Sequence, residues 1–560
     1  MIGSHSPHRN FSRSFALGLA LVLTVAGPPL AAQSPKERIA APEFPDKKDW
    51  LNTSGPIKMA DLKGKVVILD FWTLCCINCM HILPDLAKLE KKYPNELVVI
   101  GVHSAKFENE KDTKSIRKAI LRYEIAHPVI NDGDHDLWNA YNAQSWPSFA
   151  VIDAEGKYFG STSGEGKLEL LDKVVGELIA EAKKKKILND KPIRFDLVRY
   201  RETADTPLFF PGKIAADAKG ERLAIADSTH HRIVIAEASG KKLDVIGSGS
   251  PGYKDGKFAE AKFDDPQGLA FDGDLLYIAD RKNHVIREAD LKAGTIRTIA
   301  GTGKQEQDYR ARLKLTPSDS RKTELNSPWD LLLIDKKLYI AMAGHHQIWV
   351  LDLAKFKVMP VAGYGDEVII DGEFAKSGFA QPSGLATDGK NMYVADSEGS
   401  AIRQFPLDGK GSVTTLIGYP APKREDPRAG MCLFKFGDID GTPDKAKLQH
   451  ALAVACYDGR ILIADTYNSK LKSYDPLTTE TKTLLGGVDE KDKDKGPLFN
   501  EPAGLCVVGD KLFVADTNAH RIRVVDLKTN AVSTLKIDGL EPPPPQKEWL
   551  PPDDKKPEKK

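Results

Sequence analysis

The sequence has almost no net charge, few cysteines and, beyond its first 25 residues, no long apolar run. Its 80 Lys and Arg residues nearly balance 79 Asp and Glu residues, so the charge favours neither nucleic acid nor an acidic membrane surface as a partner. No later segment is apolar enough to cross a bilayer, and we expect no membrane span in the mature chain. Six cysteines in 560 residues are too few for a disulfide framework.

Two kinds of catalytic motif are also missing. There is no Gly-x-Ser-x-Gly elbow of the sort that presents a nucleophilic serine in hydrolases. No second ligand pair lies at zinc-site spacing from Cys75, Cys76 and Cys79, because the other cysteines fall in a different part of the chain. We therefore expect neither a metal nor a cofactor, and the clustering of these three cysteines indicates redox chemistry.

The N-terminal residues have the layout of a secretory signal peptide. Arg9 and Arg13 precede an apolar run from 15 to 25, and small residues follow at a cleavage position after residue 32. An uncleaved membrane anchor is the alternative, but about 11 apolar residues are too few to span a bilayer. We predict a signal peptide over 1–32 and a mature protein that is periplasmic or extracellular.

Residues 36–188 alternate strand-like and helix-like patterns. The continuous apolar run Val66–Leu69 suits a strand that is buried on both faces, and 78–92 has helical spacing. Strands that alternate with helices predict an α/β domain. The next residues, 189–207, are predicted to be a linker.

From residue 208 the chain repeats. Pro266, Pro328, Pro382 and Pro502 each precede, at a constant spacing, the end of an apolar strand such as Tyr277–Asp280. Six copies of four strands predict a six-bladed β-propeller over 208–540. How the ring closes stays open, and 193–200 could add an outer strand to the last blade. The Pro- and Lys-rich tail, 541–560, is predicted to be disordered.

Histidines recur after the strand ends of this repeat, at positions 231, 284, 346 and 520. A metal site is one interpretation. The other is a repeated turn in which His and Asp satisfy backbone groups, and it is favoured because the histidines belong to different blades. We assign no metal to them.

Cys76 and Cys79 join the predicted buried strand to the helix that follows it. Cys76 would lie at the helix N-terminus, where free N–H groups and the macrodipole favour a thiolate. Cys79, one turn along, is placed to attack the mixed disulfide that Cys76 forms. The sequence therefore predicts a dithiol in which Cys76 is the exposed attacking thiol and Cys79 the resolving one.

Several residues around this dithiol resemble the thioredoxin superfamily in its redoxin-like branch. Trp146-Pro147-Ser148-Phe149 is similar to the cis-proline loop of that family, and Pro84 lies where its active-site helix is kinked. The resemblance implies a cis Trp146–Pro147 bond and a proton-accepting role for Asp70. A carboxylate satisfied by its neighbours is the alternative for Asp70.

Two positions depart from the family pattern. Cys75 stands where a Trp precedes the first catalytic cysteine, and Ile77-Asn78 replaces Gly-Pro. Cys75 is either a third redox thiol or a residue that only packs. Since the dipeptide tunes the reduction potential in this family, the direction of electron flow stays open.

The repeats resemble NHL repeats, most clearly over 266–287. A redoxin-like domain joined to such a propeller resembles the family of NHL repeat-containing protein 2 and its bacterial relatives. The resemblance implies a thiol–disulfide oxidoreductase of the exported compartment that acts on protein thiols or disulfides with a redox partner protein, the propeller serving as docking surface. The alternative is a propeller-based interaction or scaffold protein whose redox motif is vestigial or regulatory.

Overall fold

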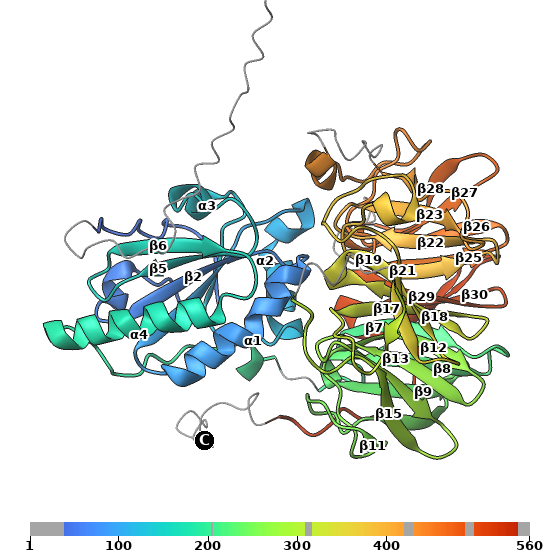
Figure 1. Cartoon of the computed structure of the whole chain (residues 1–560), viewed down its shortest axis with the longest axis horizontal. Helices are drawn as coiled ribbons and strands as arrows, with labels where there is room; N and C mark the ends of the chain where they lie inside the picture. The colour runs from blue at the N-terminus through green and yellow to red at the C-terminus, as the bar shows by residue number, and fades with distance from the viewer. Residues whose placement is uncertain (1–37, 203–204, 308–315, 419–428, 488–497, 547–560) are drawn as a thin grey trace, which may run out of the picture.

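The computed structural model describes residues 38–202, 205–307, 316–418, 429–487 and 498–546. Within these ranges the chain forms an α/β domain and a ring of antiparallel sheets, which lie side by side (Figure 1). The predicted signal peptide and most of the predicted tail lie outside the described residues.

The first domain is built on one mixed sheet with the strand order β1-β4-β3-β2-β5-β6. Strand β2 pairs parallel with β3 and antiparallel with β5. The elements are β1 (Trp50–Leu51), η1 (Met59–Leu62), β2 (Val66–Trp72), α1 (Ile77–Lys92), β3 (Leu97–His103), η2 (Glu108–Lys111), α2 (Thr113–Arg122), β4 (Val129–Asn131), α3 (Asp136–Ala140), β5 (Ser148–Ile152), β6 (Tyr158–Ser163), α4 (Leu168–Lys185) and η3 (Val198–Tyr200).

Strand β2 is buried along its whole length, as its continuous apolar run predicts. On one face Val66 and Ile68 pack with Ile82 and Leu86 of α1 and with the apolar side of α4. On the other face the alternate residues of β2 pack towards α3. The domain has a thioredoxin-like fold, which confirms the predicted class.

Six sheets follow, and each is made of four consecutive strands with the first strand innermost. Short strands β11 (Gly256–Lys257) and β16 (Ser318–Asp319) extend the outer edges of blades two and three. The blades are β7–β10 (Pro211–Ala216, Arg222–Asp227, Arg232–Glu237, Lys242–Ile246), β12–β15 (Pro266–Asp272, Leu275–Asp280, Val285–Asp290, Thr295–Ala300), β17–β20 (Pro328–Ile334, Lys337–Met342, Gln347–Asp352, Lys357–Ala362), β21–β24 (Pro382–Thr387, Asn391–Asp396, Ala401–Pro406, Thr414–Ile417), β25–β28 (Ala453–Tyr457, Arg460–Asp465, Lys470–Asp475, Glu480–Gly486) and β29–β32 (Pro502–Val508, Lys511–Asp516, Arg521–Asp526, Val532–Leu535).

The ring closes edge to edge, because the innermost strand β7 contacts both β12 and β29. The Phe210 N–H of blade one donates to Nδ1 of His520 in blade six at 3.1 Å. The outer strand suggested for 193–200 is therefore wrong. Ile193 and Phe195 instead pack on the core of the thioredoxin-like domain, where they bury apolar surface.

The predicted linker also differs from the structure over most of its length. Asn189 N–H donates to the Gly64 carbonyl at 2.9 Å, and Val198 N–H donates to Asn52 Oδ1 at 2.8 Å. The chain thus stays on the thioredoxin-like domain to about residue 200, and only a short connection leads to the propeller. This brings the N-terminal end of α1 against the ring (Figure 1).

Candidate active site

Cys76 caps the N-terminus of α1. Its backbone is extended, with φ −77° and ψ 117°, and its Sγ accepts a hydrogen bond from the Cys79 N–H at 3.3 Å. Cys79 lies one turn further and deeper, with 1% of its surface exposed against 8% for Cys76. The two thiols are not joined by a disulfide in this structure. Their placement allows Cys79 to reach a sulfur bonded to Cys76.

The prediction that Cys76 is exposed is wrong, because the propeller covers the end of α1. Burial raises the pKa of the Cys76 thiol, against the hydrogen bond from Cys79, and nearby Glu367 and Glu398 of the propeller raise it further. Burial likewise raises the pKa of Cys79, with added contributions from Cys76 and Asp70. In this docked arrangement both groups are thiols at neutral pH.

Asp70 lies on β2 and is completely buried. Neither of its carboxylate oxygens has a hydrogen-bond partner among the described residues. Burial raises the pKa of Asp70 to about 7, although nearby His127 opposes the shift. Within the described part of the chain no hydrogen bond satisfies this carboxylate, and a carboxyl group with a pKa near neutrality suits proton exchange.

The Trp146–Pro147 peptide bond is cis, as the resemblance implies. Pro147 is buried, and the half-buried Trp146 packs on the apolar cluster that contains the three neighbouring cysteines. The Trp146 Nε1–H donates to the Ser104 carbonyl at 3.0 Å, and the ring packs at a tilt against Trp138, with 4.5 Å between centroids and 38° between the ring planes. The loop is thereby fixed beside the dithiol.

The loop before the dithiol is held by Glu110, a residue that the sequence analysis did not single out. Its Oε1 accepts the Cys75 N–H at 2.9 Å, and its Oε2 accepts Thr73 Oγ1 at 2.5 Å and the Lys106 N–H at 2.8 Å. The Cys75 thiol is 1% exposed, and burial, Glu110 and Glu398 raise its pKa well above the usual range. Cys75 is thus packed beneath the loop, next to charged groups of both domains.

The propeller offers the thioredoxin-like domain one buried residue from each blade. Five of these residues directly precede an innermost strand, and His450 lies three residues before β25. All six have a left-handed backbone, with φ between 50° and 63°: Phe210, Asp265, Ser327, Gln381, His450 and Glu501. Because the repeat places them at one end of the ring, they form a single surface. We call it the blade-end ring.

Several polar contacts join the blade-end ring to the first domain. Ser327 Oγ lies 2.6 Å from Nε2 of His81 in the first domain. The other ring nitrogen of His81, Nδ1, lies 2.9 Å from Oε2 of Glu165 in the same domain. Glu501 Oε1 accepts from Asn109 Nδ2 at 3.1 Å. Polar contacts of this kind are typical of domain interfaces that separate more readily than a hydrophobic core.

A buried lysine adds charge to this interface. Lys106 of the first domain forms ion pairs with Glu367, at 3.4 Å, and with Glu398 of the propeller. Burial opposes the charge of Lys106, but the two carboxylates raise its pKa well above the usual value. The interface therefore carries a desolvated charge cluster close to the dithiol.

The recurring histidines are inter-blade clamps. Nδ1 of His231, His284 and His346 accepts a backbone N–H from the blade-end residue of the next blade, at 3.0 to 3.2 Å. His520 makes the bond that closes the ring. This arrangement supports the backbone-satisfying interpretation.

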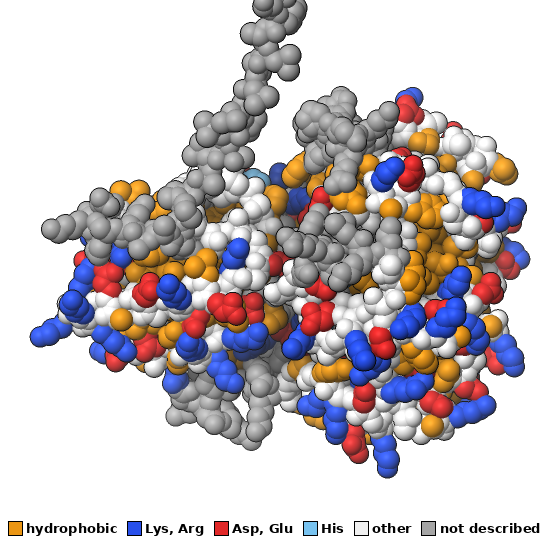
Figure 2. Space-filling view, in the orientation of Figure 1, with side chains coloured by type: hydrophobic (Ala, Val, Ile, Leu, Met, Phe, Trp, Pro, Cys, Tyr) orange, Lys and Arg blue, Asp and Glu red, His pale blue; other side chains and the backbone are white. Residues whose placement is uncertain are grey.

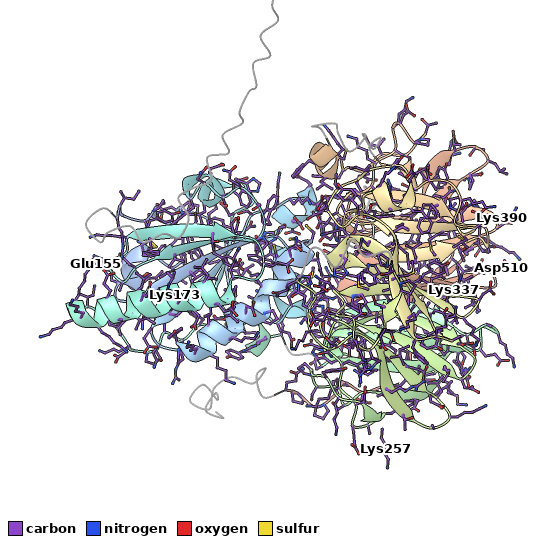
Figure 3. All side chains as sticks on the ribbon, viewed as in Figure 1. Glu155, Lys173, Lys257, Lys337, Lys390 and Asp510 are labelled. Atoms are coloured by element: carbon purple, nitrogen blue, oxygen red, sulfur yellow. The ribbon has the colours of Figure 1, made fainter. Side chains whose placement is uncertain are left out.

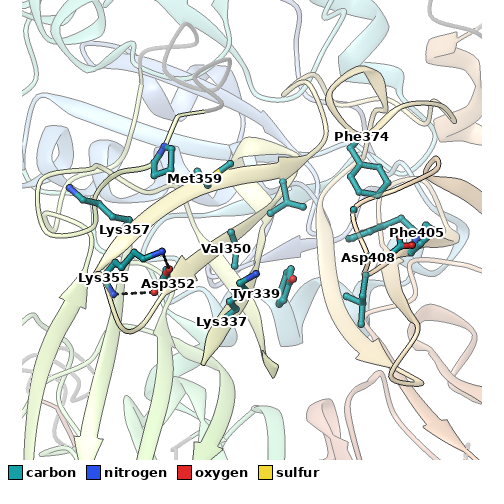
Figure 4. A pocket seen from close by; sticks show the side chains of 15 residues that line it. Lys337, Tyr339, Val350, Asp352, Lys355, Lys357, Met359, Phe374, Phe405 and Asp408 are labelled. Atoms are coloured by element: carbon teal, nitrogen blue, oxygen red, sulfur yellow. Dashed lines mark hydrogen bonds and ion pairs between the residues drawn. The ribbon is translucent and has the colours of Figure 1, made fainter. Parts of the chain in front are cut away.

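Charged side chains of both signs are spread over the face in Figure 2. Lys390 and Asp510 lie on the side of the propeller away from the first domain (Figure 3). A pocket of about 430 Å³ opens between blades three and four, lined by apolar residues such as Tyr339 and Phe405 and by lysines such as Lys337 (Figure 4). None of its lining residues belongs to the dithiol site.

No helix within the described residues is both long and apolar enough to cross a membrane. In the same part of the chain, no group of three or more His, Cys, Asp or Glu side chains is arranged to hold a metal ion.

Known proteins share both halves of this architecture. A thioredoxin-like family model matches residues 64–158, and an NHL-repeat model matches residues 499–525. The chain is 41% identical over 535 residues to NHL repeat-containing protein 2 of Gallus gallus, covering 89% of this chain and 72% of that protein. The chain belongs to the family of NHL repeat-containing protein 2. It is also 44% identical over 537 residues to Protein SUPPRESSOR OF QUENCHING 1, chloroplastic, of Arabidopsis thaliana, covering 92% of this chain and half of that protein's length.

Shorter relatives match only the thioredoxin-like domain of the present chain. Thiol-disulfide oxidoreductase YkuV of Bacillus subtilis is 29% identical over 147 residues, covering 26% of this chain and 98% of that protein. A solved thioredoxin-like protein in the oxidized form is 29% identical, covers 26% of this chain and 97% of its own, and has a TM-score of 0.24. The thioredoxin-like family match and the oxidoreductase relative support a redox-type function at a coarse level.

Proposed function

We propose that the protein is a thiol–disulfide oxidoreductase that uses Cys76 and Cys79 on protein clients. The observation that carries the proposal is the geometry of the dithiol: Cys76 caps α1, and the Cys79 N–H lies 3.3 Å from its sulfur. A sulfur at this position gains the field of the helix N-terminus whenever it is a thiolate.

The reaction consists of two exchange steps. The Cys76 thiolate attacks a client disulfide, forms a mixed disulfide and releases one client thiolate. Cys79 then loses its proton to Asp70 and attacks the Cys76 sulfur, which closes the Cys76–Cys79 disulfide and releases the second client thiolate. The client gains the two electrons that the dithiol loses, and a redox partner protein supplies two electrons that reduce the Cys76–Cys79 disulfide back to the dithiol. The reverse sequence oxidises a client dithiol.

The propeller, in this proposal, is the docking surface for clients. Its blade-end ring already contacts the thioredoxin-like domain through polar pairs such as Ser327–His81 and Glu501–Asn109. Glu398, another propeller residue, adds the ion pair with Lys106. Since Cys76 is 8% exposed, a client reaches it when the two domains part. The docked form is then the resting form, and the parted form reacts.

One observation favours a second candidate, an interaction or scaffold protein whose redox motif is vestigial or regulatory. All three neighbouring thiols are buried, and burial raises the pKa of each. A motif that never leaves the interface would serve to join the domains rather than to react.

Trapping of clients separates the two candidates. In the exporting compartment Cys79→Ser should accumulate mixed disulfides through Cys76, seen as high-mass bands that a reductant removes. Cys76→Ser should accumulate none, and Cys75→Ser should behave as wild type if Cys75 only packs. If Cys79→Ser captures nothing and the wild type shows no reversible dithiol titration, the scaffold function becomes the better account.

We also propose that the protein works in an exported compartment. Support comes from the charged, apolar and small-residue layout of residues 1–32. Mass spectrometry of the mature protein should place its N-terminus near Gln33. A mature protein that retains Met1 contradicts this proposal and leaves the dithiol chemistry untouched.

A further inference from the structure

Gln381 of the propeller reaches across the domain interface to the loop that carries the dithiol. Its Oε1 accepts the Ile77 N–H at 2.8 Å, and its Nε2 donates to the Cys75 carbonyl at 3.0 Å. These two backbone groups belong to the residues on either side of Cys76. One side chain from blade four therefore holds the backbone before and after the attacking sulfur.

Contacts within the propeller also hold Gln381 in place. Its backbone is left-handed, with φ 63°, and its N–H donates to Nδ1 of His346 in the preceding blade at 3.1 Å. Ser397 Oγ donates to its carbonyl at 2.8 Å and lies 3.3 Å from its Nε2. Since Ile77 offers only a donor and Cys75 only an acceptor, the orientation of the amide is defined. The side chain has no exposed surface.

This contact acts on the end of helix α1 that favours a thiolate. The first N–H groups of a helix are unsatisfied and form its positive end. Gln381 Oε1 takes the Ile77 N–H and brings the negative end of an amide dipole next to Cys76. In the docked form the helix therefore stabilises a Cys76 thiolate less than it does when Ile77 N–H is free.

Other charged and titratable groups face the same loop and stay in place when Gln381 is changed. They come from both domains: Asp70, Cys79, Lys106 and Glu110 of the first domain, and Glu367 and Glu398 of the propeller. Their contributions are common to the wild type and to every Gln381 variant, so a difference between variants reports on Gln381.

We propose that Gln381 is a positioning residue of the redox site supplied by the propeller, which holds the backbone on both sides of Cys76 and opposes the positive end of α1 while the domains are docked. The inference rests on the proposed function, in which Cys76 is the attacking thiol. Docking and parting of the domains then change the reactivity of Cys76 as well as its access.

The test is the pH profile of Cys76 alkylation in the full-length reduced protein. Iodoacetamide is the probe, and peptide mapping separates Cys76 from Cys75 and Cys79. Gln381→Met keeps the side-chain length but removes both hydrogen bonds, and should lower the midpoint of the profile by about half a pH unit. Gln381→Glu places a carboxylate beside the sulfur and should raise the midpoint by about one unit.

Gln449→Ala is the matched control. Gln449 is also a propeller glutamine at the interface, and its Oε1 accepts the Asn109 N–H at 3.2 Å, away from the dithiol loop. Weaker docking alone speeds alkylation at every pH and leaves the midpoint unchanged, which is the expected result for this variant.

Opposite midpoint shifts in the two Gln381 variants support the proposal. Unchanged midpoints, or shifts of the same sign in both variants, overturn the proposal. If Gln381→Glu does not fold, the presence or absence of the midpoint shift in Gln381→Met decides alone. Alkylation requires no disulfide exchange, and the trapping experiment keeps Gln381 intact. Failure of this inference and failure of the proposed function are therefore distinguishable.

Discussion

Asp70 in the thioredoxin-like domain and Asp227 in the propeller are both completely buried, but their surroundings differ. Asp227 accepts hydrogen bonds from the Phe209 N–H at 2.7 Å and from Arg232 Nε at 2.8 Å, and it lies 2.9 Å from Nδ1 of His230. Burial alone would raise the pKa of Asp227, but these neighbours lower it. Asp70 has no hydrogen-bond partner in the described parts of the chain, and burial raises its pKa to about 7.

The difference in hydrogen bonding follows from repetition, whereas burial raises the pKa of the hydrogen-bonded Asp396 to about 7 as well. An aspartate at the end of the second strand recurs in five of the six blades, and each copy accepts a backbone N–H at 2.5 to 2.9 Å: Asp227, Asp280, Asp396, Asp465 and Asp516. Such a residue is a structural component that each blade provides with partners. Asp70 occurs once and is left without them, which in a native protein points to a chemical role.

The largest effect is expected from Asp227→Ala. The change leaves the buried Arg232 without its carboxylate and the Phe209 N–H without its acceptor. Breaking a buried pair of this kind costs about 3–5 kcal/mol of stability. We expect a lower denaturant midpoint for the propeller transition. Glu260→Ala, on the exposed surface, should change the free energy of unfolding by about 0.5 kcal/mol or less. Equal stability of the two variants would contradict the structural role.

Asp70→Asn should act in the opposite direction. Asp70 ionises near pH 7 in the folded protein and near pH 4 in the unfolded chain. Ionisation of Asp70 therefore favours the unfolded state as soon as the pH exceeds about 4, and the effect is complete above about pH 7. Wild-type stability should therefore fall as the pH rises from about 4 to about 7, and the variant should lack this part of the slope. At pH 8 the variant should be more stable by about 2–4 kcal/mol.

The same variant should exchange disulfides more slowly, because Cys79 loses its proton acceptor. Gain of stability with loss of rate is the combination that marks Asp70 as functional. Denaturant unfolding at several pH values and a dithiol turnover assay measure the two effects. Loss of stability in Asp70→Asn at pH 8 would remove the contrast with Asp227.

His81→Ala tests the place where the two domains meet. The variant loses the contacts of His81 with Ser327 at 2.6 Å and with Glu165 at 2.9 Å. We expect docking to weaken by about 2–3 kcal/mol, since buried partners are left unsatisfied. Small-angle scattering should show a larger radius of gyration. Lys173→Ala, on the exposed side of α4 (Figure 3), should leave it unchanged, and an unchanged radius for His81→Ala would show that other contacts alone hold the domains together.

Local patterns in the sequence predict much of this molecule. The apolar run of β2, the cysteine spacing and the recurring strand-end aspartates depend on neighbouring residues, so they predict the fold class and the position of the dithiol. Cys76 is buried where the propeller meets the end of α1, and Gln381, which accepts the Ile77 N–H there, lies 304 residues away from Ile77 in the chain. Nothing local to either residue indicates this contact, and the sequence therefore predicts an exposed sulfur where the structure has a covered one.

The contacts of the blade-end residues with the first domain are likewise not predictable from local sequence patterns. Gln381, His450 and Glu501 occupy one structural position with different side chains, because each meets a different part of the thioredoxin-like domain. A repeat is detected by what its copies share, whereas this surface is built from what differs between them. Their left-handed backbone shortly before the innermost strand is the common feature, and backbone angles are not visible in a sequence.

The smallest effect is expected from the clamp that closes the ring. Among the described His–backbone bonds, only that of His520 closes the ring, because it joins His520 to Phe210, which lies 310 positions earlier in the chain. Burial lowers the pKa of His520 to about 3, so its ring is neutral and Nδ1 accepts the Phe210 N–H. His520→Asn retains a residue type that tolerates the left-handed backbone and removes the ring. We expect a loss of about 1–2 kcal/mol at pH 8.

This loss should shrink in acid. The unfolded chain protonates His520 near pH 6.5 but the folded propeller keeps it neutral down to about pH 3, so in the wild type this histidine disfavours folding increasingly as the pH falls between these values. Asn does not titrate, and the stability difference between wild type and variant should narrow from pH 7 to pH 5. His284→Asn is the matched control, because its clamp joins two blades that the chain already connects. Hydrogen exchange should accelerate in β7 and β29 for His520→Asn but not for His284→Asn. Equal protection of β7 and β29 in the two variants would mean that the packing of the innermost strands closes the ring without the clamp.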